Sequence, residues 1–231
     1  MKKNKELHLF ILWEKSRHKE KEILEDIGSN FEIIRTFNIH WSEELFAENL
    51  SRLYGKKLLK THRKSELCGT GDFLLVMVYD HDPIYREGVN AKTASYKRIY
   101  REMTGGGHLI HGSDNLDEVE DSLIFLLHKN SKEFLKTYKT PWNGKHININ
   151  QEIIGAPCWQ DEKELISFIE KLPETTLKKV QDTHLIIAKD VAKICRFLNA
   201  SKRMFFMKRN LYRVPLSGED KFIYIRKPLD A

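Results

Sequence analysis

The sequence predicts an α+β protein made of a larger N-terminal unit and a second, smaller α/β unit. Three observations predict this class: short apolar runs alternate with segments of helical period, one run is apolar enough for a central strand, and the composition changes near residue 140. The chain has 231 residues, 41% hydrophobic and 31% charged, which suffices for one large core or two small ones. We expect the two units to span residues 1–137 and 145–231.

Strands and helices alternate in the first part of the chain. Leu7 to Trp13 (LHLFILW) predicts a strand, and the charged segment 17–27 with its spaced isoleucines predicts a helix that stops at Gly28-Ser29-Asn30. Phe31 to Ile39 predicts a second strand, and Ser42 can cap a helix that continues to Leu53. The first unit therefore begins as β-α-β-α.

A central strand and a further helix complete the predicted first unit. Residues 72–79 (DFLLVMVY) are almost wholly apolar, as expected for a strand covered on both faces. Ser113 or Asp114 can cap a helix over 115–129, with Asp117 and Glu118 in its first turn, where the helix dipole favours acidic residues. Three or four strands with helices on one side predict a sandwich of the ferredoxin-like kind.

The segment 137–145 (TYKTPWNGK) contains turn formers and no apolar period, which predicts the domain boundary. Beyond it the sequence predicts a helix over 162–171, a strand over 183–188, a helix over 190–198 and a hairpin that joins 211–216 to 221–226.

Composition limits the partners and the location. The net charge of +6 favours anionic partners in general, nucleotides as well as nucleic acid. The 39 basic and 33 acidic residues are interspersed and form no basic stripe typical of nucleic-acid binding. The basic and aromatic stretch Tyr96 to Arg101 keeps nucleic-acid binding as the lowest-ranked hypothesis. No apolar run reaches 18 residues and the N-terminal segment lacks signal-peptide features, so we expect a cytoplasmic protein without a membrane partner. The three cysteines form no CxxC pair, which predicts free thiols.

A histidine segment carries a family resemblance. Residues 108–114 read His-x-x-His-Gly-Ser-Asp and precede an amphipathic helix. This segment, with the strands before it, resembles the phosphohistidine region of nucleoside diphosphate kinases over about residues 5–135. The resemblance implies that family's fold, with His111 as the phosphate carrier, and a site that includes Gly112 and Ser113. It further implies phosphate binding by Arg98, which lies thirteen residues before His111, and by Arg86.

The implied chemistry is consistent with these residue types. A neutral imidazole can attack a γ-phosphate, hold it as a phosphoramidate and pass it to a second acceptor. Arginines and backbone amides at the start of the helix near Ser113 would stabilise the moving phosphoryl group. The implied cofactor is Mg²⁺ with a nucleoside triphosphate. The acceptor and the base preference stay open, as does assembly into a homo-oligomer.

Several residues depart from the family pattern. Glu14 stands where the family has a phosphate-contacting lysine, Ser122 stands where it has a histidine-orienting glutamate, and His108 replaces an asparagine. Glu14 and His108 are therefore candidate modulators: a carboxylate beside His111 would repel phosphate and favour the protonated imidazole, which is not nucleophilic. The competing interpretation of His111 is a histidine hydrogen-bonded at a helix start. A nucleotide-binding pseudoenzyme or scaffold is thus the alternative to a phosphotransferase-like protein.

Residues 182–187 (DTHLII), followed by a helix and then by residues 222–226 (FIYIR), resemble nucleotidyltransferase-fold domains of bacterial surface-polysaccharide proteins. The resemblance implies a link to that pathway. Those domains hold metal ions with three aspartates, whereas this chain offers only Asp182, with His184 and Tyr224 at the other two positions. We therefore expect a degenerate unit without nucleotidyl transfer and without a metal site. A small α/β appendage in which Asp182 merely begins a strand is the alternative.

Overall fold

The computed structural model describes residues 5–54, 61–150, 161–172, 174–180, 183–198, 200–206, 209–215 and 220–228. Its contacts divide the chain into two compact units, Met1–Ala47 with Leu59–Glu152, and Glu48–Leu58 with Ile153–Ala231. The first unit thus ends later than residue 137.

The first unit is built on a five-stranded sheet with the order β6-β1-β3-β2-β7. β3 (Phe73–Asp80) lies at its centre between β1 (Glu6–Leu12) and β2 (Glu32–His40), which confirms the central strand predicted from the apolar run. β6 (Ile110–Gly112) pairs antiparallel with β1 and forms one edge. β7 (His146–Asn150) pairs parallel with β2 at the opposite edge, although the sequence predicts a boundary just before it.

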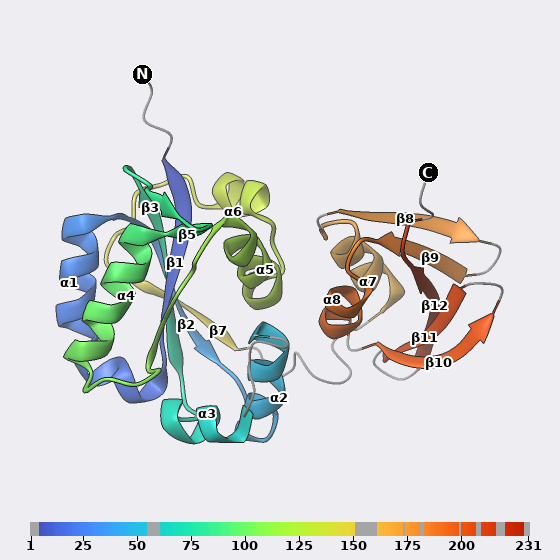
Figure 1. Cartoon of the computed structure of the whole chain (residues 1–231), viewed down its shortest axis with the longest axis horizontal. Coiled ribbons are helices and arrows are strands. Elements are labelled where there is room, and N and C mark those ends of the chain that lie inside the picture. The colour runs from blue at the N-terminus through green and yellow to red at the C-terminus, as the bar shows by residue number, and fades with distance from the viewer. Residues whose placement is uncertain are drawn as a thin grey trace. The chain divides into compact units, whose positions relative to one another are not determined.

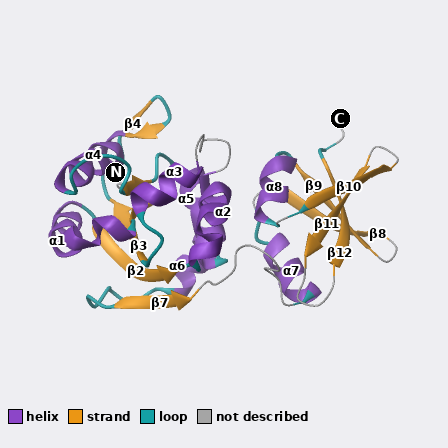
Figure 2. Cartoon of the chain, turned by 90° about the horizontal axis from the view of Figure 1, so that it is seen from below, coloured by secondary structure: helices purple, strands orange, loops and turns teal. Residues whose placement is uncertain are grey.

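Helices cover both faces of this sheet, not one face as the sequence pattern suggests (Figures 1 and 2). α1 (Glu20–Asn30), preceded by a 3₁₀ turn η1 (Glu14–Lys19), and α4 (Ala91–Met103) lie on one face, and α5 (Leu116–Leu127) and α6 (Ser131–Thr137) on the other. The remaining elements are α2 (Glu43–Tyr54), α3 (Thr61–Cys68) and the short hairpin β4 (Tyr85–Arg86) with β5 (Val89–Asn90).

Alternation along β1 builds two cores. Phe10 and Leu12 belong to a cluster with α1 and with Tyr100 of α4, and the Phe10 ring meets the Tyr100 ring edge-on at 5.4 Å. Trp13, at the end of β1, packs instead against Trp41 and Phe46, at centroid distances of 6.2 and 6.0 Å. Because both faces are buried, β1 and its edge neighbour β6 are held in one register.

The second unit is a five-stranded sheet with the order β10-β11-β12-β9-β8 and two short helices. All its pairs are antiparallel except β12 with β9. The predicted helices, strand and hairpin are present, and β8 and β10 are additional. The elements are α7 (Glu162–Ile169), β8 (Thr175–Val180), β9 (Thr183–Ala188), α8 (Val191–Phe197), β10 (Ser201–Phe206), β11 (Arg209–Pro215) and β12 (Asp220–Arg226).

Within the described ranges, none of the helices combines the length and the apolar character that a membrane crossing needs.

Candidate functional site

His111 sits in the middle of the edge strand β6. It is paired with Ile11 of β1 and is 9% exposed. Its chain neighbours are fixed on the β1 side, since Trp13 N donates to Leu109 O and Ser113 N donates to Leu9 O, both at 3.1 Å. The backbone on this side therefore offers little freedom to the histidine.

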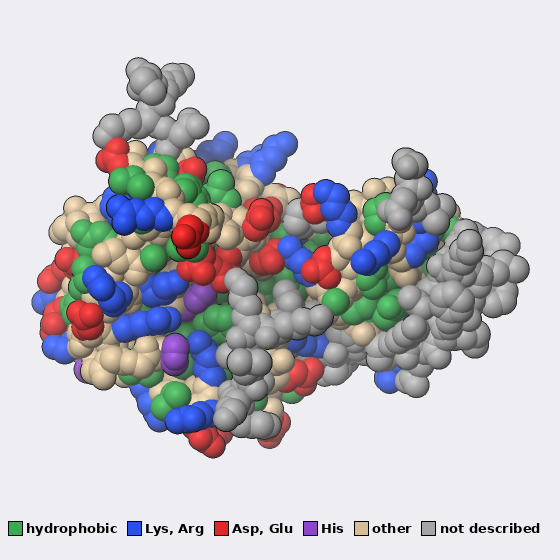
Figure 3. Space-filling view, viewed as in Figure 1, with side chains coloured by type: hydrophobic (Ala, Val, Ile, Leu, Met, Phe, Trp, Pro, Cys, Tyr) green, Lys and Arg blue, Asp and Glu red, His purple; other side chains and the backbone are tan. Residues whose placement is uncertain are grey.

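Two cations of α4 hold the outer side of the same strand. Arg101 Nε donates to Ile110 O at 2.9 Å, and Lys97 Nζ donates to Gly112 O at 3.0 Å. The helix and the strand have matching repeats. Four residues of helix span about 6 Å and two residues of strand span about 6.6 Å. Side chains one helical turn apart on α4 therefore reach every second carbonyl of β6. Cationic side chains gather beside α4 in Figure 3. These contacts satisfy the edge strand on both sides of His111.

Glycine is required at position 112 because α4 and β1 approach the strand closely. A methyl group there would lie 3.1 Å from two carbons of the Phe10 ring and 3.4 Å from Lys97 Cβ. Phe10 is fully buried and cannot move aside without disturbing the core.

We expect Gly112→Ala to lower the free energy of unfolding by about 1–3 kcal/mol, the usual cost of overpacking a core. Gly28→Ala is the matched control, since its methyl group would meet only Ile33 Cδ1 at an ordinary 3.8 Å. Alanine in helix α1 should raise stability by up to about 1 kcal/mol. Urea unfolding of the two variants measures both values, and equal stability of the two would contradict the close approach at Gly112.

Glu118, in the first turn of α5, brings a carboxylate to His111. Asn115 caps the helix by accepting from Glu118 N at 3.0 Å, and Glu118 Oε2 accepts from Asp114 N at 2.6 Å. The other oxygen, Oε1, lies 3.9 Å from His111 Nε2. The cap is thus Asn115 and not Ser113 or Asp114 as the sequence suggests. This turn fixes a carboxylate beside the imidazole without using the position of Ser122, which is buried.

Ser113 ends β6 and enters a buried polar network. Its hydroxyl lies 3.0 Å from His8 Nδ1, and His8 Nε2 lies 3.0 Å from the side-chain nitrogen of Asn90. Asn90 also donates to Asp80 Oδ2 at 2.9 Å, and Lys92 donates to Asp80 Oδ1 at 3.0 Å. Asn90 can only donate to His8, so a neutral His8 carries its proton on Nδ1 and donates it to Ser113. The network links β1, β3 and α4 to the residue that follows the His111 strand.

The network fixes the charge states of its two titratable buried groups. Burial lowers the pKa of His8 below its ordinary value, although the nearby Asp80 and Glu6 oppose the change. Burial alone would raise the pKa of Asp80, but hydrogen bonds from Asn90 and Lys92 outweigh it, and the pKa of this carboxyl falls below its usual value. At neutral pH the network therefore holds a neutral histidine and a charged aspartate.

We expect His8 to make the protein less stable in weak acid. Its folded pKa lies below the unfolded value of about 6.5, so the stabilisation is complete above that pH and is lost as the pH falls below it. Urea unfolding between pH 5 and pH 8 should show a steeper loss of stability in the wild type than in His8→Gln. Because the chain has ten histidines, the difference between the two profiles is the measurement. Parallel profiles would contradict a buried neutral His8.

Cations crowd around the segment that leads into β6. Burial raises the pKa of the Cys68 thiol to about 11, against the opposing charges of Lys64, Lys15 and Arg101. Partial burial, with the charges of Arg101 and Lys64, lowers the pKa of His108. Neighbouring positive charges disfavour one another's protonated forms, and a bound anion would relieve that repulsion. The guanidinium of Arg101 uses its Nε to donate to the Ile110 carbonyl, and within the described residues its terminal N–H groups can still bind a ligand.

The structure separates the other residues implied by the resemblance. Arg98 and Arg86 are exposed, on α4 and on the β4–β5 hairpin, and none of their described contacts reaches His111. His108 is exposed next to Arg101. Glu14 is directed to a turn, where its Oε2 accepts from Gly71 N at 2.7 Å.

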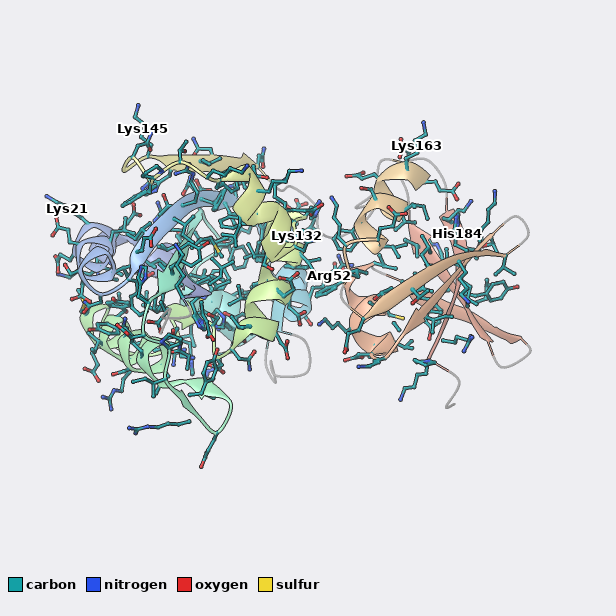
Figure 4. The ribbon with its side chains drawn as sticks, turned by 90° about the horizontal axis from the view of Figure 1, so that it is seen from above. Lys21, Arg52, Lys132, Lys145, Lys163 and His184 are labelled. Atoms are coloured by element: carbon teal, nitrogen blue, oxygen red, sulfur yellow. The ribbon has the colours of Figure 1, made fainter. Side chains whose placement is uncertain are left out.

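In the second unit, Asp182 lies outside the described residues, so its metal-binding position stays a prediction. His184 Nδ1 lies 3.3 Å from Glu162, which also pairs with Lys221 at 2.8 Å (Figure 4). Tyr224 is half-buried in β12. His184 is thus paired with a carboxylate of helix α7.

Comparisons with known proteins give similarity in structure and none in sequence. No protein-family model matches the sequence, and no curated protein matches it significantly. Over 54% of its length the chain is similar in structure to a nucleoside diphosphate kinase. That protein is from Aquifex aeolicus, 96% of it is covered, the sequence identity is 18% and the TM-score is 0.40. Any function must therefore be argued from the geometry around His111.

Proposed function

We propose that the first unit is a nucleotide-binding, phosphotransferase-like domain in which His111 accepts the γ-phosphoryl group of a nucleoside triphosphate. The observation that carries the proposal is the setting of His111: a nearly buried imidazole with a carboxylate 3.9 Å from Nε2, beside a guanidinium that holds the adjacent strand carbonyl. A fixed imidazole with a carboxylate nearby to compensate positive charge is suited to nucleophilic attack on phosphorus.

In the proposed reaction a ring nitrogen of neutral His111 attacks the γ-phosphorus. The bond from phosphorus to the β–γ bridging oxygen breaks, and the nucleoside diphosphate leaves with the electron pair. The imidazole becomes positively charged, and the Glu118 carboxylate compensates that charge. In the second half of the cycle an acceptor oxygen attacks the phosphorus, and neutral His111 is released.

Three backbone amides around the start of α5 are already used within the protein. The amides of Ser113, Asp114 and Glu118 already bond within the protein, to Leu9 O, Glu118 and Asn115. Phosphate binding therefore falls to Arg101 and to Lys64 and His108 around it. Among the described residues no group of three or more His, Cys, Asp or Glu side chains could hold a metal, so Mg²⁺ would arrive with the nucleotide's own phosphates, whose charge it neutralises.

We expect the full chain, incubated with γ-labelled ATP and magnesium, to acquire a label that is labile in acid and stable in alkali, the behaviour of a phosphoramidate. His111→Ala should abolish the label, whereas His40→Ala, a matched replacement of an exposed histidine on β2, should retain it. Label that persists in His111→Ala would refute the proposal.

The second candidate function is nucleotide binding without transfer, in a regulatory or scaffold protein. It is favoured by the amides of Asp114 and Glu118, which bond within the protein, and by the acidic side chains of the same two residues. Calorimetric binding of ATP without any acid-labile label would select this candidate. A link to surface-polysaccharide synthesis rests on the resemblance of the second unit alone.

A further inference from the structure

A cavity of the first unit lies away from His111. Its volume is about 530 Å³, within the range of about 300–1,000 Å³ that small-molecule sites occupy. Residues at the beginnings of β1 and β2 and the end of β3 line one side, and the segment from α6 to β7 lines the other. The cavity thus lies at the end of the sheet where β1 and β2 begin and β3 ends, whereas His111 pairs with Ile11 near the other end of β1.

Two aromatic walls of this cavity are held in place before any ligand arrives. The indole nitrogen of Trp142 donates to Thr36 Oγ1 at 3.0 Å and to Lys145 O at 3.1 Å. Lys145 itself points outward from the same turn (Figure 4). The Tyr138 ring packs edge-on against Phe37 at 5.4 Å, and the Arg35 guanidinium lies over it at 5.5 Å. Preorganised rings lower the entropic cost of stacking a flat ligand.

Arg35 also fixes the loop that carries these walls. Its guanidinium donates to Thr140 Oγ1 at 2.6 Å and to Pro141 O at 3.1 Å. Thr140 and Pro141 both line the cavity. One cation therefore clamps the loop and supports the Tyr138 ring, which makes the shape of the cavity a property of the fold.

The charged side chains that line the cavity include one more lysine than is needed to balance its carboxylate. Lys5 lies 3.8 Å above the Tyr79 ring and 3.7 Å from Glu32, and Glu32 also accepts from His81 at 2.8 Å. The one carboxylate of the lining is thus compensated. Lys139, which is exposed at the rim, has no acidic partner among the described residues. A ligand that complements this lining has a flat apolar body and a negative group.

We propose that this cavity is a binding site for a small planar aromatic molecule that carries an acidic group. The ring stacks between the walls formed by Tyr138 and Trp142, and the acidic group pairs with Lys139. The site shares no residue with the His111 region, so its binding can be tested independently of phosphoryl transfer.

The test uses the full chain, labelled with ¹⁵N, and the probe 2-naphthoate. The indole signal of Trp142 is assigned by its loss in Trp142→Phe, and its shift is followed during titration. We expect a saturable shift with 2-naphthoate, a weaker response to the uncharged 2-naphthamide, and none with cyclohexanecarboxylate, which has the charge without the ring. Lys139→Glu should weaken 2-naphthoate binding about fivefold, because a rim attraction becomes a repulsion.

Lys132→Glu is the matched control, since it reverses an exposed lysine on α6 that does not line the cavity. It should leave the affinity for 2-naphthoate unchanged. The proposal is overturned if the Trp142 signal does not move, if cyclohexanecarboxylate moves it equally, or if the two charge reversals weaken binding to the same extent.

Discussion

Arg101→Ala should reduce formation of the acid-labile phosphoprotein about a hundredfold, which is the usual effect of removing one donor to a developing charge. Arg101 lies on the side of α4 that faces β6, and its Nε is anchored on the carbonyl next to His111. Its remaining donors are therefore held at the edge of the sheet, along the strand that carries His111. A fixed guanidinium binds two phosphate oxygens at once.

Arg98→Ala is the decisive comparison, because the family resemblance assigns phosphate binding to Arg98. That residue is exposed on the same helix, so we expect its loss to change the labelling rate by less than about twofold. Arg101→Lys should recover part of the rate, since it keeps the charge and loses the second donor. The rate of label incorporation at low ATP concentration distinguishes the three variants. A large loss with Arg98→Ala and a small one with Arg101→Ala would place the phosphates elsewhere.

Arg98 and Arg101 also show how much of the site can be predicted from the sequence. The spacing of thirteen residues from His111 singles out Arg98, but spacing along the chain does not state which side of a helix faces the strand. Once α4 is known to run from Ala91 to Met103, Lys97 and Arg101 are one turn apart and both reach β6. The sequence carries this signal in the i, i+4 pair of cations, and only packing shows that the pair faces inward.

Glu118 was predictable as a residue of the first turn but not as the partner of His111. The expected caps, Ser113 and Asp114, are engaged elsewhere: Ser113 with His8, and Asp114 with Lys97 at 2.6 Å. The helix is therefore capped by Asn115 and begins at Leu116, and the Glu118 side chain turns back to accept from Asp114 N. The contact of Glu118 with His111 depends on His8, a buried residue of the first strand, which engages Ser113. No sequence signal near Glu118 therefore predicts it.

The fold was predictable where the local sequence of a segment is enough to determine its secondary structure. The uninterrupted apolar run of β3 identifies a central strand, and the second-unit hairpin is marked by its turn residues. β7 was missed because its sequence, HININ, alternates only weakly and its burial depends on parallel pairing with β2, more than a hundred residues earlier. The expected boundary near residue 140 marks a loop inside the first unit, held by Arg35 through Pro141 O.

Asp80→Ala should have the largest effect on stability, a loss of about 2–4 kcal/mol in the free energy of unfolding at neutral pH. The carboxylate is fully buried and accepts from Asn90, from Lys92 and from the backbone nitrogen of Asp82 at 2.9, 3.0 and 3.1 Å. Its removal leaves a buried amide and an ammonium group without their acceptor. Asp117→Ala, which removes an exposed aspartate in the first turn of α5, is the matched control and should cost less than about 1 kcal/mol.

The pH dependence of the free energy of unfolding tests the contribution of the Asp80 charge separately from that of its packing. Because the folded pKa of this carboxyl lies below the unfolded value of about 3.9, its stabilisation is present above that pH and is lost as the pH falls through the folded pKa. The stability difference between wild type and Asp80→Ala, measured by urea unfolding, should therefore shrink below about pH 4. Since Asn90 ties the network to the backbone of Asp114 at 2.7 Å, the variant should also label His111 more slowly. A difference below about 1 kcal/mol at neutral pH would mean that the buried network does not form as described.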